Sequence, residues 1–195
     1  MNAEPERFHP ETRAAWRLWL ECNHLTRRSV WLVTWKKHTG KPAVTYDEAV
    51  SEALAFGWVD SKPAKLDADR TMLYISPRRP GSAWSRPNKE RVQAMHDFGL
   101  MADAGARAVH TARADGSWDR LNDVENLIVP SDLAKALDRH PGARSTWDAF
   151  PRSAKRGILE WIAQARRPET RAKRVEDTAA RAAEGERANQ WRPTH

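Results

Sequence analysis

A short segment of this chain carries two adjacent arginines, an aspartate, a lysine and a tryptophan that could together bind a ligand. Adjacent arginines bind carboxylate or phosphate groups through charge-assisted, often bidentate hydrogen bonds. A tryptophan that follows a Pro-Gly turn could form an apolar wall of the same site. The predicted ligand-binding residues are Asp60, Lys62, Arg78, Arg79 and Trp84.

The same residues also have a structural interpretation, and the sequence leaves both open. Asp60 could pair with Arg78 or Arg79 and so fix the loop, while Trp84 fills the core. A third interpretation makes Asp60 a general acid or base of an enzyme that acts on a small anionic substrate. The sequence contains no Gly-x-Ser-x-Gly elbow and no dinucleotide-binding glycine pattern, so we assign no catalytic residue.

Two strands and a loop must position these residues. Residues 58–65 and 70–77 predict an antiparallel hairpin, in which Asp60 and Lys62 share one face because side chains alternate along a strand. Pro63 cannot donate a backbone hydrogen bond, which predicts an edge strand or a bulge at that point. Ser85 is placed to cap the helix that follows the loop.

The preceding elements have clear sequence signals. Residues 10–24 predict a helix, and residues 29–35 predict a central strand because both of its faces are apolar. Thr45 and Glu48 form a Thr-x-x-Glu capping box at the start of the next helix. Gly57 is placed to end that helix in a left-handed conformation.

The rest of the chain predicts helices. Beyond the loop, Val92, Met95 and Phe98 are expected on the inner face of one helix, and the second half continues with several more. The predicted fold class is α+β, a small antiparallel β-sheet packed with helices and followed by a helical C-terminal half. The expected domains are an α+β core over residues 1–125, a helical region over 126–187 packed on it, and a disordered tail over 188–195.

The net charge of the chain suggests an anionic partner. The 195 residues include 33 Lys and Arg against 26 Asp and Glu, which gives a net charge of +7. A basic balance raises encounter rates with anions. One alternative function is therefore nucleic-acid binding through the basic C-terminal helices, with an affinity that falls steeply as salt rises.

Metal sites, disulfides and membrane spans lack sequence support. The seven histidines include no His-x3-His pair and have no accompanying cysteines, so we expect no metal and no cofactor. Cys22, the single cysteine, cannot form an intramolecular disulfide and is expected in the core. No segment is apolar enough to be a signal peptide or to span a membrane, which predicts a cytoplasmic protein.

The chain resembles the YdeI or OmpD-associated family, also called bacteriocin-protection proteins. Four segments carry the resemblance, which extends from about residue 11 to 191: FGWVDSK, SPRRPGSAWSRPNKERV, VWLVTWKKHTGKPAVTYDEAVSEAL and RRPETRAKRV. The family often has Ile-Asp-Gly where this chain has Val59-Asp60-Ser61. The resemblance implies tolerance of bacteriocins or antimicrobial peptides and association with an outer-membrane porin, and it implies no catalytic residues.

The sequence thus predicts a bacterial stress-tolerance protein that is not an enzyme. It would act by binding a small anionic ligand near Asp60, Arg78, Arg79 and Trp84, or by binding a protein partner, which the resemblance associates with the cell envelope.

Overall fold

The computed structural model describes residues 5–189 and divides the chain into two compact units. Unit 1 ends at Trp118 and unit 2 begins at Asp119, a few residues before the predicted boundary at 125/126. Of the tail expected over 188–195, Ala188 is buried, whereas residues 190–195 lie outside the described residues. Within the described range, no helix combines the length and the hydropathy that a membrane span needs.

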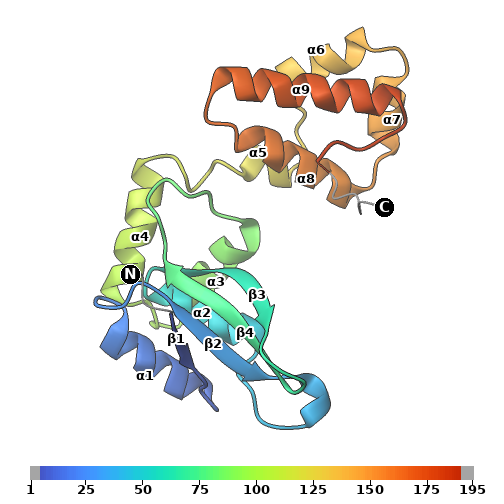
Figure 1. The fold of residues 1–195 in the computed structure, drawn as a ribbon. Coiled ribbons are helices and arrows are strands. Elements are labelled where there is room, and N and C mark those ends of the chain that lie inside the picture. Colours follow the sequence, from blue (N-terminus) through green and yellow to red (C-terminus); the bar gives the residue numbers. More distant parts are fainter. Residues whose placement is uncertain (1–4, 190–195) are drawn as a thin grey trace. The chain divides into compact units, whose positions relative to one another are not determined.

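Figure 1 shows the elements in chain order. Those of unit 1 are β1 (Glu6–Phe8), α1 (Arg13–Asn23), β2 (Val30–Trp35), the 3-10 helix η1 (Lys37–Thr39), α2 (Tyr46–Ala55), β3 (Trp58–Lys65), β4 (Arg70–Pro77), α3 (Arg86–Asp97) and α4 (Asp103–Ala114). Those of unit 2 are α5 (Asn122–Glu125), α6 (Ser131–Arg139), α7 (Ala143–Ala149), α8 (Arg152–Ala163) and α9 (Pro168–Ala183).

Unit 1 contains a four-stranded sheet in the order β1-β2-β4-β3. This confirms the α+β fold class, the central position of β2 and the hairpin of β3 and β4. The sheet is mixed rather than wholly antiparallel, because β1 pairs in parallel with β2. The sequence did not predict β1, which has only three residues, Glu6, Arg7 and Phe8, and therefore too few alternating positions to show a strand pattern.

One face of the sheet forms the main core of unit 1. Apolar side chains of β2 and β4, such as Val30, Leu32 and Ile75, pack there with residues of α1 and α2. Figure 1 shows α2 behind the sheet. Buried tryptophans need partners for their N–H groups, and Trp16 donates to the Ala49 carbonyl at 3.0 Å.

A β-bulge interrupts β3. Asp60 pairs with Ile75, but the next regular pair is Pro63 with Leu73, so three steps on β3 correspond to two on β4. The extra residue confirms the irregularity predicted at Pro63. A bulge of this kind reverses which side chains face which side of the sheet. Residues of β3 on opposite sides of the bulge therefore cannot be assigned to faces by counting in twos.

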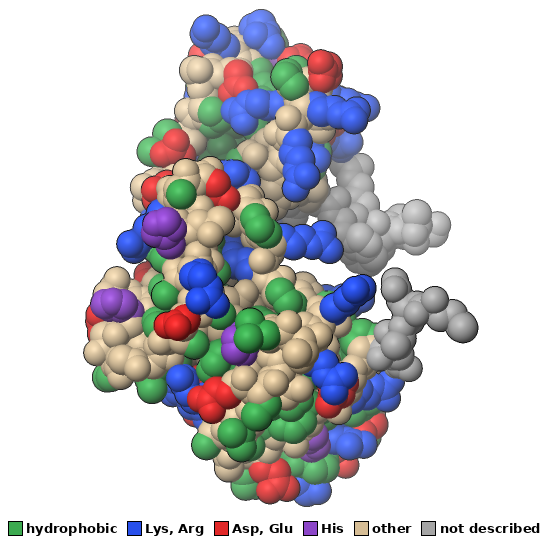
Figure 2. Space-filling view, turned by 90° about the vertical axis from the view of Figure 1, so that its left-hand side faces the viewer, with side chains coloured by type: hydrophobic (Ala, Val, Ile, Leu, Met, Phe, Trp, Pro, Cys, Tyr) green, Lys and Arg blue, Asp and Glu red, His purple; other side chains and the backbone are tan. Residues whose placement is uncertain are grey.

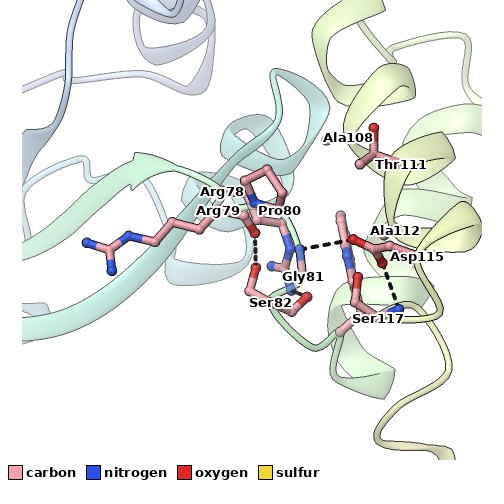
Figure 3. Close-up of a pocket in the computed structure, with 11 residues that line it drawn as sticks. Arg78, Arg79, Pro80, Gly81, Ser82, Ala108, Thr111, Ala112, Asp115 and Ser117 are labelled. Carbon is pink, nitrogen blue, oxygen red and sulfur yellow. Dashed lines mark hydrogen bonds between the residues drawn. The ribbon is translucent and has the colours of Figure 1, made fainter. Parts of the chain in front are cut away.

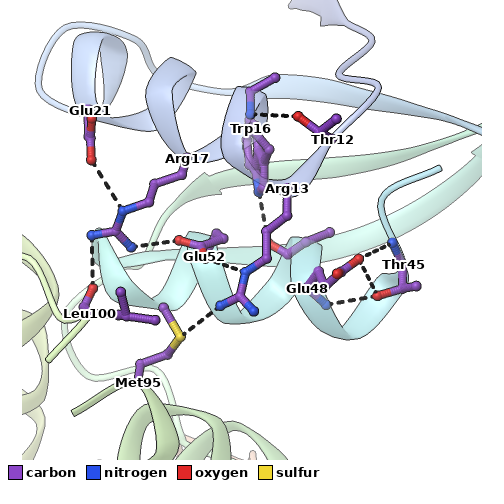
Figure 4. A network of polar contacts seen from close by, with 12 residues as sticks. Thr12, Arg13, Trp16, Arg17, Glu21, Thr45, Glu48, Glu52, Met95 and Leu100 are labelled. Carbon is purple, nitrogen blue, oxygen red and sulfur yellow. Dashed lines mark hydrogen bonds and ion pairs between the residues drawn. The ribbon is translucent and has the colours of Figure 1, made fainter. Parts of the chain in front are cut away.

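A buried carboxylate connects α1 to α2. Glu52 is 1% exposed, and its two oxygens accept hydrogen bonds from Arg13 Nε at 2.6 Å and Arg17 Nη1 at 2.8 Å. Figure 4 shows both guanidinium groups converging on this one side chain. Arg17 also donates to the Leu100 carbonyl at 3.1 Å, so the network extends to the segment between α3 and α4.

Replacing Thr45 with alanine is expected to lower the free energy of unfolding by about 1 kcal/mol. The predicted capping box is present: the Thr45 hydroxyl accepts from the Glu48 N–H at 3.2 Å, and the Glu48 carboxylate accepts from the Thr45 N–H at 2.9 Å. The Thr45 backbone N–H and, at 2.8 Å, the Thr45 hydroxyl both donate to the Glu48 carboxylate, and these two bonds lower the pKa of Glu48. Their stabilisation is therefore present above the ordinary carboxyl pKa and is lost as the pH falls through the lowered value. Urea denaturation at several pH values measures both effects.

Thr12→Ala is the matched control for that prediction. Thr12 caps α1 in the same way, accepting from the Ala15 N–H at 3.1 Å, but alanine occupies the position that Glu48 has in α2. Both variants should lose similar stability at neutral pH. Thr45→Ala removes the hydroxyl bond to the Glu48 carboxylate and keeps the backbone one, so this variant alone should lose part of its acid sensitivity. An equal acid response in the two variants would contradict the capping-box account.

Unit 2 is formed by helices that surround an apolar core of their own. Leu133, Leu137, Trp147, Ile158 and Ile162 are almost completely buried in it. Leu133 and Leu137 are four residues apart, as are Ile158 and Ile162, the spacing that places side chains on one face of a helix.

Two side chains predicted to be buried in unit 1 are exposed. Phe98 is 77% exposed, because α3 ends at Asp97 and the chain turns there. Cys22 is exposed as well, on the outer side of α1. Helical spacing near a helix end is a weak guide to burial, because the next segment of the chain decides what covers that turn.

Candidate functional site

The end of β4 holds two of the five predicted ligand-binding residues together. The guanidinium carbon of Arg78 lies 3.8 Å from the centre of the Trp84 ring, a cation–π arrangement. Arg78 Nη2 donates to the carbonyl groups of Ala83 and Ser82. Arg78 therefore fixes the loop between β4 and α3 through backbone carbonyls, and not through the pairing with Asp60 that the structural interpretation assumed.

Trp84 is 1% exposed and belongs to the core between α2, α3 and α4. Its ring lies 5.0 Å from that of Trp118, and its backbone N–H donates to the Ser117 carbonyl at 3.3 Å. The β4–α3 loop is thereby attached to the turn after α4. Trp84 thus serves both as a core residue and as a wall of the space beside Arg78.

A small pocket of about 80 Å³ lies between this loop and α4. Figure 3 shows it bounded by the loop on one side and by the end of α4 and its turn on the other. A volume of this size admits a few water molecules or one small anionic group. Its lining residues are Arg78, Arg79, Pro80, Gly81, Ser82, Trp84, Ala108, Thr111, Ala112, Asp115 and Ser117.

Two polar atoms in the lining are buried without a hydrogen-bond partner among the described residues: Arg78 Nε and Ser117 Oγ. Ser117 is 1% exposed. Leaving a buried polar group without a partner costs about 1–3 kcal/mol, and more for a charged group. A molecule bound in the pocket could satisfy both atoms, which makes this the best candidate site in unit 1.

The Asp115 carboxylate places a negative charge on one side of the pocket. One carboxylate oxygen accepts from the Ser117 N–H at 2.8 Å and the other accepts from the Gly81 N–H at 3.1 Å. These bonds hold the Pro-Gly turn against the end of α4 (Figure 3). Both oxygens are engaged with backbone donors, so Arg78 remains the group in the pocket that attracts an anion.

Burial lowers the pKa of Arg78 to about 10, and the negative charge of Asp60 opposes part of that effect. The guanidinium is therefore still protonated at neutral pH. A cation that has lost much of its hydration interacts more strongly with an anion than an exposed one does.

Asp60 and Arg79 do not enter the pocket as binding groups. Asp60 accepts a hydrogen bond from the Tyr46 hydroxyl at 2.9 Å, at the start of α2. Arg79 is exposed, and Figure 3 shows its side chain pointing away from the pocket. Its backbone carbonyl accepts from the Ser82 hydroxyl at 2.6 Å, so Arg79 shapes the turn.

Lys62 lies on the other face of the sheet. Its amino nitrogen is 5.5 Å from the centre of the Trp31 ring and 5.6 Å from that of Tyr74. The bulge between Asp60 and Pro63 separates Lys62 from Asp60, although the two were expected to share a face.

The sequence analysis missed Asp115 and Ser117 as site residues. More than thirty residues separate their segment from the arginine loop. The Asp-Gly-Ser order signals a turn, but nothing in it indicates which distant loop the turn will meet.

No metal centre is evident among residues 5–189, where no three His, Cys, Asp or Glu side chains are grouped closely enough to hold an ion.

Several basic residues of unit 2 form ion pairs, and on the face of the molecule that Figure 2 shows, Lys and Arg side chains are interspersed with Asp and Glu side chains. Arg171 pairs with Asp132 at 2.7 Å, Arg156 with Glu125 at 3.0 Å and Arg181 with Asp177 at 2.9 Å. This pairing reduces the positive potential on which the prediction of nucleic-acid binding by the C-terminal helices depends.

Comparison with known families gives two matches, one in each half of the chain. Residues 126–185 match the family described as Bacteriocin-protection, YdeI or OmpD-Associated. This confirms the predicted resemblance for a region that includes the RRPETRAKRV segment. The other three segments lie instead within residues 8–108, which match a model described as Domain of unknown function (DUF8412). No curated protein and no solved structure matches the chain.

The match over residues 8–108 covers just over half of the 195 residues. The chain therefore belongs to the family described as Domain of unknown function (DUF8412), and it carries a second region that matches the bacteriocin-protection, YdeI or OmpD-associated family.

Proposed function

We propose that this chain is a bacteriocin-protection protein that is not an enzyme and that binds a small anionic ligand in the pocket beside Arg78. The match of residues 126–185 to the bacteriocin-protection family supports the biological role. The ligand site is supported by one observation above all: Arg78 Nε and Ser117 Oγ are both buried without partners in the same pocket.

The polar groups that line the pocket indicate which functional group the ligand carries. Arg78 Nε–H is a charged donor and needs an acceptor, whereas the Ser117 hydroxyl can donate or accept. A carboxylate meets both requirements, because one oxygen can accept from each group. The pocket holds only the anionic end of a ligand, so the rest of a larger molecule would extend from its mouth.

Replacing Ser117 with alanine should separate ligand binding from folding. Without ligand, the variant is expected to be as stable as wild type or more stable, by up to about 1 kcal/mol, because it removes a buried hydroxyl that has no partner. It keeps the backbone bonds to Asp115 and Trp84. With ligand, it should be stabilised less than wild type, because a ligand stabilises the native state according to its affinity.

Thermal unfolding with acetate and inorganic phosphate, at constant ionic strength set with sodium chloride, measures both effects. Arg79→Ala is the matched control: it removes the neighbouring arginine, whose side chain points away from the pocket, and should respond to ligand as wild type does. Equal responses of wild type and Ser117→Ala to both anions would refute this binding site. Survival of bacteria expressing wild type or Ser117→Ala during bacteriocin challenge then tests whether the pocket serves protection.

A further inference from the structure

The face of the sheet opposite α1 and α2 carries aromatic and basic side chains. Trp31 on β2 and Tyr74 on β4 are direct cross-strand partners, with ring centres 5.0 Å apart. Both are only partly buried. Figure 1 shows no other segment of unit 1 in front of these two central strands. The open sheet face is defined here as Trp31, Trp35, Lys41, Lys62 and Tyr74.

Positive charge is placed directly over these rings. Lys62 is exposed, and its amino group lies over Trp31 and Tyr74 at 5.5 and 5.6 Å from the ring centres. Further along the same face, the Lys41 amino group lies 3.9 Å from the centre of the Trp35 ring. Within the described part of the chain, neither lysine is within ion-pair distance of a carboxylate. Each cation is thus available to a partner that also contacts the ring beneath it.

The acidic groups nearest to these strands are positioned away from Lys62. Asp60 bonds to Tyr46 on the helix side of the sheet, because the bulge reverses the faces of β3. Asp67 lies in the β3–β4 turn, where Arg70 binds its carboxylate at 2.7 Å. The open sheet face therefore presents cations and aromatic rings at its centre.

We infer that the open sheet face binds single-stranded nucleic acid. Bases stack on exposed aromatic side chains, and lysines bind the phosphates between them. Trp31 and Tyr74 provide the stacking position. Trp35 lies four residues along the same face of β2, or roughly 13 Å away, and already packs against the His9 ring, with ring centres 4.9 Å apart, so it extends the aromatic surface and is not a second free position. Lysine has a flexible stem, so Lys62 can move from the ring to a phosphate as a base stacks.

Other classes of partner would interact with fewer of the lysines and aromatic rings on the open sheet face. A cationic peptide would be repelled by the lysines, and a neutral polysaccharide would leave both amino groups without a counter-charge. A duplex hides the faces of its bases, so it could reach the lysines but could not stack on the rings.

Fluorescence anisotropy of labelled dT12 and rU12 tests the inference with the full chain at low salt. We expect saturable binding, and an abasic strand of equal length should bind at least about fivefold more weakly because it cannot stack. Tyr74→Leu removes the ring but keeps apolar bulk, and should weaken binding by about fivefold or more. Tyr74→Phe keeps the ring and should bind as wild type does.

Lys65, on the same strand, provides a matched control for the substitution of Lys62. Lys65 is exposed like Lys62, but it pairs with Thr71 beyond the bulge, on the helix side of the sheet. Lys62→Met should weaken binding and reduce the slope of log affinity against log salt by about 0.7, whereas Lys65→Met should change neither. Circular dichroism checks that each variant is folded.

Three results would overturn the inference: no binding of either oligonucleotide at low salt, equal binding of the abasic strand, or equal effects of the two lysine variants. None of these variants changes the pocket beside Arg78. A negative result would therefore count against the nucleic-acid site alone and would leave the proposed site for a small anionic ligand unaffected.

Discussion

Gly105→Ala is expected to destabilise unit 1 by about 3 kcal/mol. Gly105 lies on α4 where that helix contacts α2. A Cβ atom at this position would lie 2.6 Å from the carbonyl carbon of Ala55 and 2.8 Å from the carbonyl oxygen of Leu54, and closer still to the Ala55 oxygen. These are backbone atoms, so the two helices would have to move apart. That movement would also displace Asp115 and Ser117, which follow α4.

Gly157→Ala is the matched substitution, and we expect it to stabilise the protein. Gly157 is within α8 of unit 2, and an added Cβ would meet nothing within 4 Å. Alanine is a better helix former than glycine, so this variant should gain up to about 1 kcal/mol. Hydrogen exchange measured peptide by peptide reports each unit separately. Unchanged protection of α2 and α4 in Gly105→Ala would show that the helices are not in this close contact.

Replacing both Arg13 and Arg17 with methionine is expected to destabilise unit 1 by about 3–5 kcal/mol. The double variant leaves the carboxylate of Glu52 buried without either of its cationic partners (Figure 4). A buried charge without a partner is among the most costly defects in a folded protein. Chemical denaturation measures the loss of free energy of unfolding.

Adding Glu52→Met to that double variant should restore much of the lost stability, because an apolar cluster of similar volume replaces the unpaired charge. Arg27→Met is the control for loss of surface charge. Arg27 is 54% exposed and pairs with Glu6 at 3.5 Å, so its loss should cost less than about 1 kcal/mol. A triple variant no more stable than the double variant would mean that the arginines contribute mainly through packing.

The local elements could largely be predicted from the sequence, because their signals come from neighbouring residues. The capping box of Thr45 and Glu48 and the left-handed Gly57 define the two ends of α2. The alternation of side chains gives both strands of the hairpin with the bounds that the structure has. β1 is the exception, because a strand of three residues forms only where β2 is available to pair with it.

The candidate site could be predicted only in part. Arg78 and Trp84 are close in sequence, and they do lie together. Asp115 and Ser117 complete the pocket from a turn that no local pattern connects to the arginine loop. Arg79 has the same residue type as Arg78 and is its neighbour, yet its side chain points away (Figure 3). The residue types predicted an anion-binding site, but they did not show which of the two arginines would line it.

The sequence by itself determined the α+β class, the hairpin, the two ends of α2 and the resemblance that the family match confirms over residues 126–185. The tertiary structure alone decided where the side chains meet. One extra residue in β3 places Lys62 beside Trp31 and Tyr74 instead of beside Asp60. The physical reason is that helix and strand signals depend on contacts a few residues apart, whereas a binding site depends on the packing of segments that are distant in the chain.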